Sequence, residues 1–455
     1  MGSRGLQRRM LQVFSLWLRG GQIMCQQTGI IALSCGSASF STQTTEHAQP
    51  ALQHKKSVLV RDYIHSALYD PQSGYFSAKA EAVGTISEPI QFSLLQGRKA
   101  YLQHLNDLYK QNNVSWFTPI EIFQARFFPW YGYAIAEYIL RTLVPASPLN
   151  IYEIGGGTGT CASNILNYFR TKAPAIYKNL TYTSVEISDA LALKQQARVG
   201  AMSSHSRHFQ IRHGSASDPN TWGTVNTAPC FIIMLEVLDN LAHDLVYRKT
   251  LTSDWNETWV TESAPGSYRE ELQPLEDPLI KRCLDVISQN PHSRSSSSII
   301  SAAKSTLSQF VSLSELAWIP TGCLQMLETL HKFRPNMVLI ISDFSSLPDI
   351  TVAGTGAPLV ASKEAGQTKD HSSYLEAKGN ADIFFPTNFG LLQQLDSYVA
   401  ERASGKDGLS ERLSTVTSAE FMEQCADVEK TRTKDGYNPL LEDYSNTKFY
   451  ISFPE

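Results

Sequence analysis

The sequence predicts an α/β fold, in which a mostly parallel, doubly wound sheet follows a mainly helical N-terminal region. After residue 149, short apolar stretches typical of strands alternate with amphipathic stretches typical of helices. Such alternation is the pattern of repeated strand–helix–strand units. One stretch, Cys230–Leu235 (CFIIML), is apolar at every position, as expected for a strand that is buried on both faces of a parallel sheet.

The composition is that of an ordinary globular protein without a marked charge bias. The 455 residues carry a formal net charge of −4, which gives no global positive field to attract nucleic acid. The length favours a core domain with large additions over one minimal domain. The 7 cysteines are scattered, odd in number and without a C-x-x-C pair. We therefore expect neither a disulfide framework nor a metal site.

The first 45 residues have the composition of a mitochondrial transit peptide. They contain arginine at positions 4, 8, 9 and 19, many serines, and no acidic residue before Glu46. Transit peptides are typically rich in arginine and serine and poor in acids. A secretory signal with Ile23–Ala38 as its apolar part is the alternative, but polar residues at positions 26–28 interrupt that stretch. No later segment resembles a membrane span.

Residues 57–148 are predicted to form a mainly helical N-terminal subdomain, which would serve as a substrate platform or lid. A short apolar helix face over Val60–Leu68 stops at Asp70–Gly74, where proline and glycine indicate a turn. A second helix is expected over Leu94–Tyr109. The aromatic-rich run Phe127–Tyr133 leads into a third helix that extends through Leu143.

The stretch Leu149–Arg170 combines a short apolar strand, a glycine-rich turn and an amphipathic helix. The turn holds four glycines, at positions 155, 156, 157 and 159. Glycines let a ligand approach main-chain N–H groups without meeting a Cβ atom, and a helix N-terminus adds unpaired donors. The stretch therefore predicts a cradle for a nucleotide-like ligand at the carboxyl end of a parallel strand. A purely structural turn is the alternative.

The spacing within this turn is E-x-G-x-G-x-G, formed by Glu153, Gly155, Gly157 and Gly159. The dinucleotide fingerprint is G-x-G-x-x-G, so a nicotinamide dehydrogenase is disfavoured. The spacing resembles the first motif of class I methyltransferases that bind S-adenosylmethionine. The resemblance makes these four residues candidate cofactor-binding residues.

Acidic residues follow the next two predicted strands. Glu186 lies near the end of Tyr182–Ile187, and its two carboxylate oxygens could accept hydrogen bonds from both hydroxyls of a ribose; a solvated loop glutamate is the alternative. Asp218 follows the strand His208–Arg212 and is a weaker candidate for the adenine side.

Two carboxylates, Glu236 and Asp239, follow the most apolar strand. Carboxylates three residues apart can converge on one planar guanidinium through paired hydrogen bonds. They are the candidate catalytic residues, although Asp239 could instead cap a helix that starts at Leu241.

Later strands are predicted over Thr258–Thr261, Asn336–Asp343 and Asp382–Phe385. Residues 288–309 and 351–373 are poor in apolar side chains and are predicted to be loops or insertions in the core domain, which would span residues 149–455.

Seven segments in order resemble the MidA-type mitochondrial protein arginine methyltransferases, a family linked to assembly of respiratory complex I. Together they extend over most of the chain after residue 57. The segments are Tyr69–Phe76 (YDPQSGYF), Trp116–Phe123 (WFTPIEIF), Tyr152–Thr160 (YEIGGGTGT), Val185–Ser188 (VEIS), Met234–Asp244 (MLEVLDNLAHD), Ile340–Asp349 (IISDFSSLPD) and Asn380–Phe389 (NADIFFPTNF).

This resemblance implies a Rossmann-like class I methyltransferase fold, S-adenosyl-L-methionine as methyl donor and a protein arginine as acceptor. It implies a mitochondrial location, in the matrix, and a complex I subunit as the protein partner. It also places Thr118–Glu121 near the active site. The chain departs from the family at Gln124–Phe128 and at Asp343–Ser345, on the acceptor side. The alternative is therefore a catalytically inactive assembly factor that keeps the cofactor fold and binds a respiratory-chain subunit.

Overall fold

The computed structural model describes residues 57–78, 84–112, 117–124, 130–143, 148–288, 314–364, 367–405 and 413–454. The predicted transit peptide lies outside these residues, as do nearly all of the predicted insertion 288–309 and most of the altered stretch 124–128. Among the described residues, no helix has the length and apolar character needed to cross a membrane.

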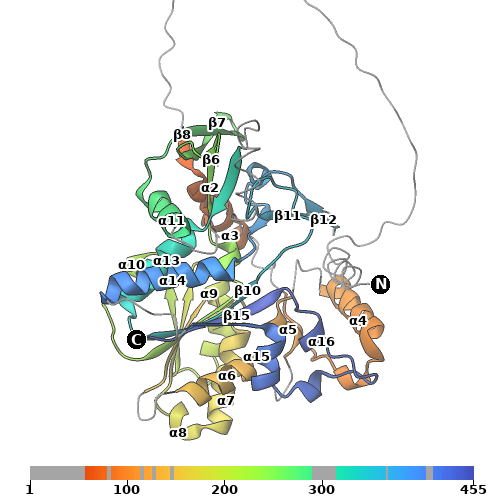
Figure 1. Ribbon diagram of the computed structural model, residues 1–455. Coiled ribbons are helices and arrows are strands. Elements are labelled where there is room, and N and C mark those ends of the chain that lie inside the picture. The colour runs from red at the N-terminus through yellow and green to blue at the C-terminus, as the bar shows by residue number, and fades with distance from the viewer. Residues whose placement is uncertain are drawn as a thin grey trace, which may run out of the picture.

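A seven-stranded sheet forms the core, in the order β14-β15-β10-β5-β2-β3-β4 (Figure 1). The pairs between β10, β5, β2, β3 and β4 are parallel, and the pairs of β15 with β10 and β14 are antiparallel. The strands are β2 (Asn150–Ile154), β3 (Thr181–Glu186), β4 (Phe209–His213), β5 (Cys230–Leu235), β10 (Met337–Phe344), β14 (Leu413–Thr417) and β15 (Thr447–Ser452). The predicted α/β fold with a mostly parallel sheet is confirmed.

Helices cover both faces of this sheet, because successive strand residues point to opposite sides. Ile233 of β5 packs in the core cluster on one face, and its neighbour Ile232 packs in the cluster on the other. Figure 1 shows the two helix layers. The first face carries α6 (Trp130–Thr142), α7 (Thr160–Lys172) and α15 (Ser418–Cys425), and the second carries α11 (Pro278–Ser288), α13 (Thr321–Phe333) and α14 (Phe389–Ser404).

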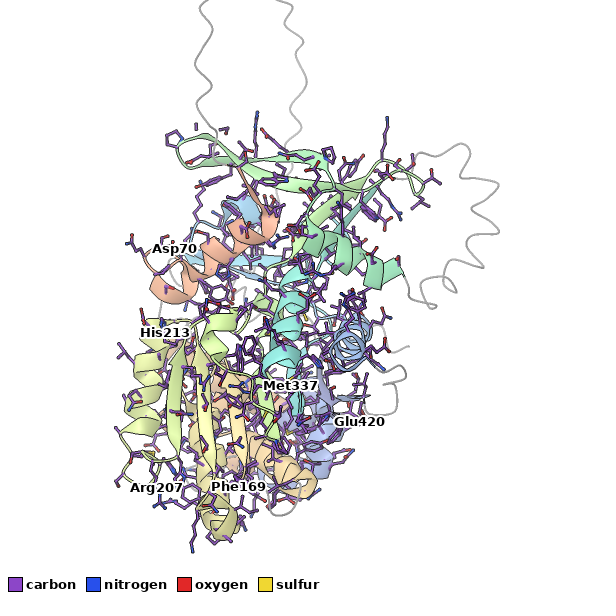
Figure 2. The ribbon with its side chains drawn as sticks, turned by 90° about the vertical axis from the view of Figure 1, so that its left-hand side faces the viewer. Asp70, Phe169, Arg207, His213, Met337 and Glu420 are labelled. Carbon is purple, nitrogen blue, oxygen red and sulfur yellow. The ribbon has the colours of Figure 1, made fainter. Side chains whose placement is uncertain are left out.

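Two smaller sheets lie beyond the carboxyl ends of the parallel strands. A five-stranded sheet consists of β1 (Ser57–Leu59), β6 (Asp244–Arg248), β7 (Asn256–Ala264), β8 (Ser267–Pro274) and β9 (Glu315–Ile319). A three-stranded sheet consists of β11 (Leu359–Glu364), β12 (Gln367–Asp370) and β13 (Ala381–Phe384). In Figure 2, His213 at the end of β4 lies on the side of Asp70, whereas Phe169 and Arg207 lie at the opposite end of the core.

The strands predicted at 258–261 and 382–385 therefore exist, but they belong to these smaller sheets rather than to the main one. β7 continues through a hairpin into β8 without an intervening helix, so it cannot be a member of a parallel strand–helix–strand unit. Residues 351–373, predicted to be a loop or insertion, contain β11 and β12, which pair with each other as an antiparallel hairpin.

Residues 57–148 are mainly helical, but their helices pack in two places. α2 (Val60–Tyr69) contributes to the core between the smaller sheets, together with Tyr75 of α3 (Tyr75–Ala78). α4 (Gly97–Asn112), α5 (Pro119–Ile122) and α6 instead pack with α7 on the main sheet. The remaining short helices are α8 (Pro174–Tyr177), α9 (Asp189–Gln195), α10 (Pro219–Trp222) and α16 (Pro439–Glu442).

Candidate functional site

A cavity of about 890 Å³ lies at the carboxyl ends of β2, β3, β5 and β10, where α2 and the three-stranded sheet face them. Its lining includes residues of the glycine turn, α2, α5, β11 and β13. This volume lies within the range of small-molecule binding sites, roughly 300–1,000 Å³. Every predicted site residue except Gly159 lines the cavity, so the fold brings together the residues that the sequence singled out.

The glycine turn has a backbone that other residues adopt only with strain. Gly155, Gly157 and Gly159 have φ angles of 68°, 52° and 83°, in the left-handed region that favours glycine. A Cβ atom on Gly157 would meet nothing within 4 Å, so this position opens directly onto the cavity. A Cβ atom on Gly159 would lie 3.2 Å from the Cα atom of Gln195. Gly159 therefore serves the packing of the turn, and the structure does not place it at the cavity wall.

Glu153 lies beneath the turn rather than in front of it. Its Oε2 accepts a hydrogen bond from the Tyr182 hydroxyl at 2.9 Å, and it would lie 3.1 Å from a Cβ atom on Gly156. Burial raises the pKa of Glu153 to about 7. The side chain supports the turn from below and borders the cavity there.

Glu186 is joined to the glycine turn through Gln195, a residue that the sequence did not indicate. Glu186 Oε1 accepts the Ser188 N–H at 2.9 Å, and its Oε2 accepts Gln195 Nε2 at 2.9 Å. Gln195 Nε2 also donates to the main-chain oxygen of Gly157 at 3.0 Å. Burial raises the pKa of Glu186 to about 7. Each carboxylate oxygen has a second lone pair, so Glu186 can still accept hydrogen bonds from ligand hydroxyls in the cavity.

Asp218 lies at the exposed rim of the cavity. Its Oδ1 accepts the Asn220 N–H at 2.9 Å, so the side chain caps the short helix α10. The capping role accounts for an aspartate here without a ligand. Contact with the adenine side of a cofactor stays a prediction.

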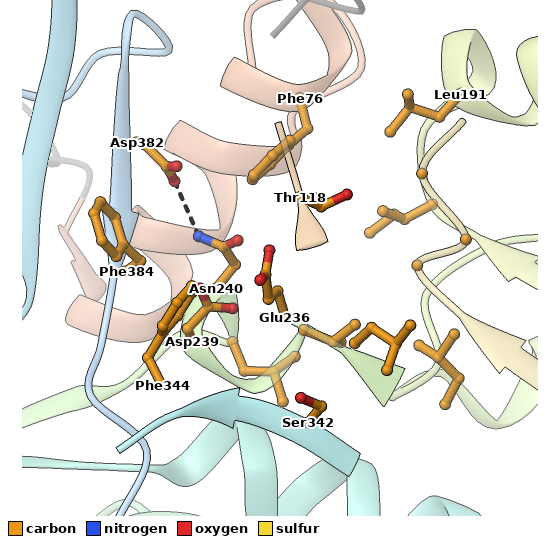
Figure 3. A pocket seen from close by; sticks show the side chains of 18 of the residues that line it. Phe76, Thr118, Leu191, Glu236, Asp239, Asn240, Ser342, Phe344, Asp382 and Phe384 are labelled. Atoms are coloured by element: carbon orange, nitrogen blue, oxygen red, sulfur yellow. Dashed lines mark hydrogen bonds between the residues drawn. The ribbon is translucent and has the colours of Figure 1, made fainter. Parts of the chain in front are cut away.

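Glu236 projects into the cavity from the end of β5. Figure 3 shows its carboxyl group pointing toward the space between Thr118 and Asn240. The residue has a φ of 54°, which for a non-glycine residue costs on the order of 1–3 kcal/mol. Its N–H donates to Ser342 of β10 at 2.8 Å, which anchors this strained backbone. Burial and the neighbouring Asp343 raise the pKa of Glu236 to about 8.

Asp239 lies beside Glu236 in a single 3-10 turn, η3 (Leu238–Asn240). The prediction that it caps a helix starting at Leu241 is wrong, because the chain continues from Leu241 into β6 without a helix. Only 5% of Asp239 is exposed, and its Oδ1 has no hydrogen-bond partner among the described residues. Burial, reinforced by the charges of Asp343 and Glu236, raises its pKa well above the usual value. An unpaired buried carboxylate oxygen is costly, so a hydrogen-bond donor on a ligand would stabilise this group.

Two further carboxyl groups, of Asp343 and Asp382, surround this pair. Asp343 Oδ2 accepts the N–H groups of Leu238 and Asp239 at 2.9 and 3.2 Å, and thereby holds the turn. Asp382 of β13 accepts a hydrogen bond from Asn240 Nδ2 at 2.9 Å, and burial raises its pKa to about 7. No sequence pattern joins Asp382 to Asp239, since Asp239 lies in η3 and Asp382 lies in β13, more than a hundred positions later. Within the described ranges, no His, Cys, Asp and Glu side chains are grouped as metal ligands would be.

Glu121 connects the wall contributed by α5 to the glycine turn. It is buried, and its Oε1 accepts hydrogen bonds from Thr158 Oγ1 at 2.5 Å, from Thr160 Oγ1 and from Arg198 Nη1 at 3.1 Å. Residues 118–121 therefore line the cavity, next to the turn, in the neighbourhood that the family resemblance implied.

The residues present fit the cofactor that the sequence predicts. The turn offers main-chain groups and open space at Gly157, and Glu186 offers acceptor oxygens on the next strand. The acidic group formed by Glu236 and Asp239 lies in the same cavity. One end of the cavity thus suits a nucleoside with an amino-acid tail, and the other suits a cation.

Residues 134–405, more than half of the chain, match the profile of a family described as "Putative S-adenosyl-L-methionine-dependent methyltransferase". The matched region contains the glycine turn, Glu186, Glu236 and Asp239. A curated relative from Schizosaccharomyces pombe is named "Protein arginine methyltransferase NDUFAF7 homolog, mitochondrial". It is 26% identical over an alignment of 371 positions, and the alignment covers 76% of this chain and 76% of the relative.

Two solved structures from Burkholderia thailandensis resemble the fold over most of its length. A crystal structure bound to S-adenosyl-homocysteine has a TM-score of 0.56 and 14% identity, and covers 87% of this chain and 88% of that chain. A native crystal structure has a TM-score of 0.52 and 14% identity, and covers 87% of each chain. At this identity the likeness shows a common fold, which confirms the predicted Rossmann-like class I fold.

Proposed function

The chain belongs to the family of S-adenosyl-L-methionine-dependent methyltransferases, with S-adenosyl-L-methionine as its cofactor, and from that premise we propose that it methylates an arginine side chain of a mitochondrial protein. The observation that carries the proposal is the buried carboxyl group of Asp239, whose Oδ1 has no partner among the described residues and lies beside Glu236 in the cofactor cavity. An anionic group of this kind suits a cationic acceptor. The name of the S. pombe relative supports arginine as that acceptor.

The cofactor, when bound, supplies an electrophilic methyl group on a sulfonium. In our proposal the main chain of the glycine turn and the carboxyl group of Glu186 bind it. Gln195 fixes the position of Glu186 relative to the turn, because it donates hydrogen bonds to both. Displacement at such a methyl group needs the attacking nitrogen in line, so most of the protein's contribution is positioning and electrostatics.

The acceptor guanidinium is protonated at physiological pH. Glu236 and Asp239 would accept hydrogen bonds from its N–H groups and align one nitrogen with the methyl group. As that nitrogen forms its bond to carbon and the carbon–sulfur bond breaks, the nitrogen releases one proton, and the unpaired Asp239 Oδ1 is placed to accept it. The methylated guanidinium remains a cation, and the proton then leaves to solvent.

A methyl-transfer assay tests this proposal. The purified chain, labelled S-adenosylmethionine and an extract of mitochondrial proteins should yield label on arginine, identified by mass spectrometry after proteolysis. Label on another residue type would contradict arginine specificity. No transfer to any mitochondrial protein, with cofactor binding intact, would favour a catalytically inactive assembly factor.

We further propose that the chain acts in the mitochondrial matrix and that its acceptor is a subunit of respiratory complex I. The arginine-rich, acid-free first 45 residues, the word mitochondrial in the relative's name and the resemblance to the MidA-type family support this. Complex I from cells without the chain should lack a methylarginine that is present in wild-type complex I. Identical methylation in both samples would contradict the proposed partner.

A further inference from the structure

The side-chain amide of Asn240 is held in one orientation by two acceptors. Its Nδ2 donates to Asp382 Oδ1 at 2.9 Å and to the main-chain oxygen of Ile383 at 3.0 Å. A primary amide has two N–H donors, so both are used. Rotation of the amide by half a turn would place its oxygen against these two acceptor oxygens. The Oδ1 atom of Asn240 must therefore point away from β13.

The direction left to this oxygen is the cavity. Figure 3 shows the Asn240 oxygen turned away from Asp382, on the side where Glu236 lies. Asn240 is only 9% exposed and lines the cavity. Among the described residues, no hydrogen-bond donor meets this oxygen. An amide oxygen that is oriented by the protein, borders the cavity and is still unpaired can accept a hydrogen bond from a ligand.

The main chain of Asn240 is also fixed. The hydroxyl group of Tyr69 donates to its carbonyl oxygen at 3.2 Å, and its N–H donates to the oxygen of Val237 at 3.3 Å. The neighbouring turn is held by Asp343. The Oδ1 atom is therefore part of a rigid wall, which is the condition for orienting a substrate atom precisely.

We propose that Asn240 is a third residue that binds the acceptor guanidinium, and that Asp382 is the positioning residue that turns its oxygen toward the acceptor. This inference rests on the proposed function. A guanidinium carries five N–H donors and no acceptor, so the neighbouring acceptor oxygens of Glu236, Asp239 and Asn240 match it. Glu236 and Asp239 supply charge, and Asn240 supplies an oxygen without a further negative charge beside them. The small sheet thus takes part in acceptor recognition through β13.

Three variants of the full chain test this, each assayed with the unmethylated form of the mitochondrial protein that the wild-type chain methylates. Asn240→Leu removes the oxygen, and Asp382→Leu removes one of the two acceptors that orient the amide. Loss of a hydrogen bond to a charged group should raise the KM for the acceptor by about tenfold or more. The Kd for S-adenosylmethionine should stay within about twofold, since neither residue faces the glycine turn. Asp382→Asn keeps an acceptor oxygen for the Asn240 amide and should restore a KM near the wild-type value.

The matched control is Asp396→Leu. Asp396 is also a buried carboxylate, but it accepts hydrogen bonds from His331 and Tyr450 and does not line the cavity. The variant should lower the melting temperature without changing the acceptor KM. If Asn240→Leu does not fold, the acceptor KM of Asp382→Leu tests the inference in its place.

Each result supports or overturns the inference. An acceptor KM within about twofold of wild type in the folded Asn240→Leu or Asp382→Leu protein overturns it and leaves arginine methylation standing. Equal KM increases in Asp382→Asn and Asp382→Leu overturn the positioning role, because charge rather than orientation would then matter. A wild-type chain that never methylates arginine overturns the proposed function and this inference together.

Discussion

Asp343 Oδ2 accepts the main-chain N–H of Asp239 at 3.2 Å, so that two carboxyl groups share one buried turn. The hydrogen bond keeps the turn in place, while burial, and after it the charge of Asp343, raises the pKa of Asp239 and of Glu236. The same contact therefore holds the acidic end of the cavity together and makes ionisation of its carboxyl groups unfavourable unless a cation is bound. Carboxyl groups with pKa values shifted in this way are common at functional sites.

Stability of the unliganded protein should fall as the pH rises. A carboxyl group whose pKa is raised on folding binds its proton more tightly in the folded chain, so the stability it contributes at low pH is lost as the pH rises through the folded pKa. For Glu236 that pKa is about 8, so the loss should extend from about pH 5 to about pH 8. Melting temperatures across this range should decline less steeply in Glu236→Gln than in wild type.

The control for this measurement is Glu88→Gln, which changes an exposed glutamate outside the cavity. Its melting curves should keep the wild-type dependence on pH. Equal slopes for wild type and Glu236→Gln would contradict a raised pKa at Glu236.

Cofactor binding should depend on Gly157. Gly157→Val places a branched side chain in the cavity, where a Cβ atom has open space and the cofactor is expected. We expect calorimetry to detect no binding of S-adenosylmethionine to a folded Gly157→Val protein. Gly266→Val is the matched control, because Gly266 also has a left-handed φ, of 72°, and open space, but lies in the β7–β8 hairpin. If Gly157→Val binds S-adenosylmethionine with wild-type affinity, the cofactor does not bind at the glycine turn.

Import should depend on the N-terminus. A chain without residues 1–45 should stay in the cytosol, because it has lost the predicted import signal, and it should keep its cofactor affinity, because the residues that line the cavity begin at Arg61. Fluorescence microscopy and calorimetry on the same truncated chain measure both properties. Finding the truncated chain in mitochondria would refute the predicted transit peptide.

The cofactor end of the cavity could be predicted from sequence because its signals are local. The glycine spacing and the acid at the end of the next strand lie within short segments whose periodicity also identifies the strands. Gly159 shows the limit of this reasoning. Its spacing fits the motif, but its place in the fold is against Gln195 rather than in the cavity wall.

The acceptor end depends on contacts between residues that are distant in sequence. Asn240 meets Asp382 across 142 positions. Periodicity identifies β7 and β13 as strands but does not say which sheet they join, because pairing depends on the topology of the whole chain. The two smaller sheets, and with them Asp382, therefore emerged only from the structure.

Turnover of Glu236→Gln tests the central claim most directly. The substitution keeps the shape of the side chain and removes the charge that would balance the acceptor cation. Losing such a contact in the transition state typically costs on the order of 3 kcal/mol, or about a hundredfold in rate. With turnover, cofactor affinity and melting temperature measured on one preparation, we predict that turnover falls about a hundredfold while cofactor affinity stays near wild type. Turnover within severalfold of wild type, in a folded protein that binds the cofactor, would contradict the role of Glu236 in arginine methylation.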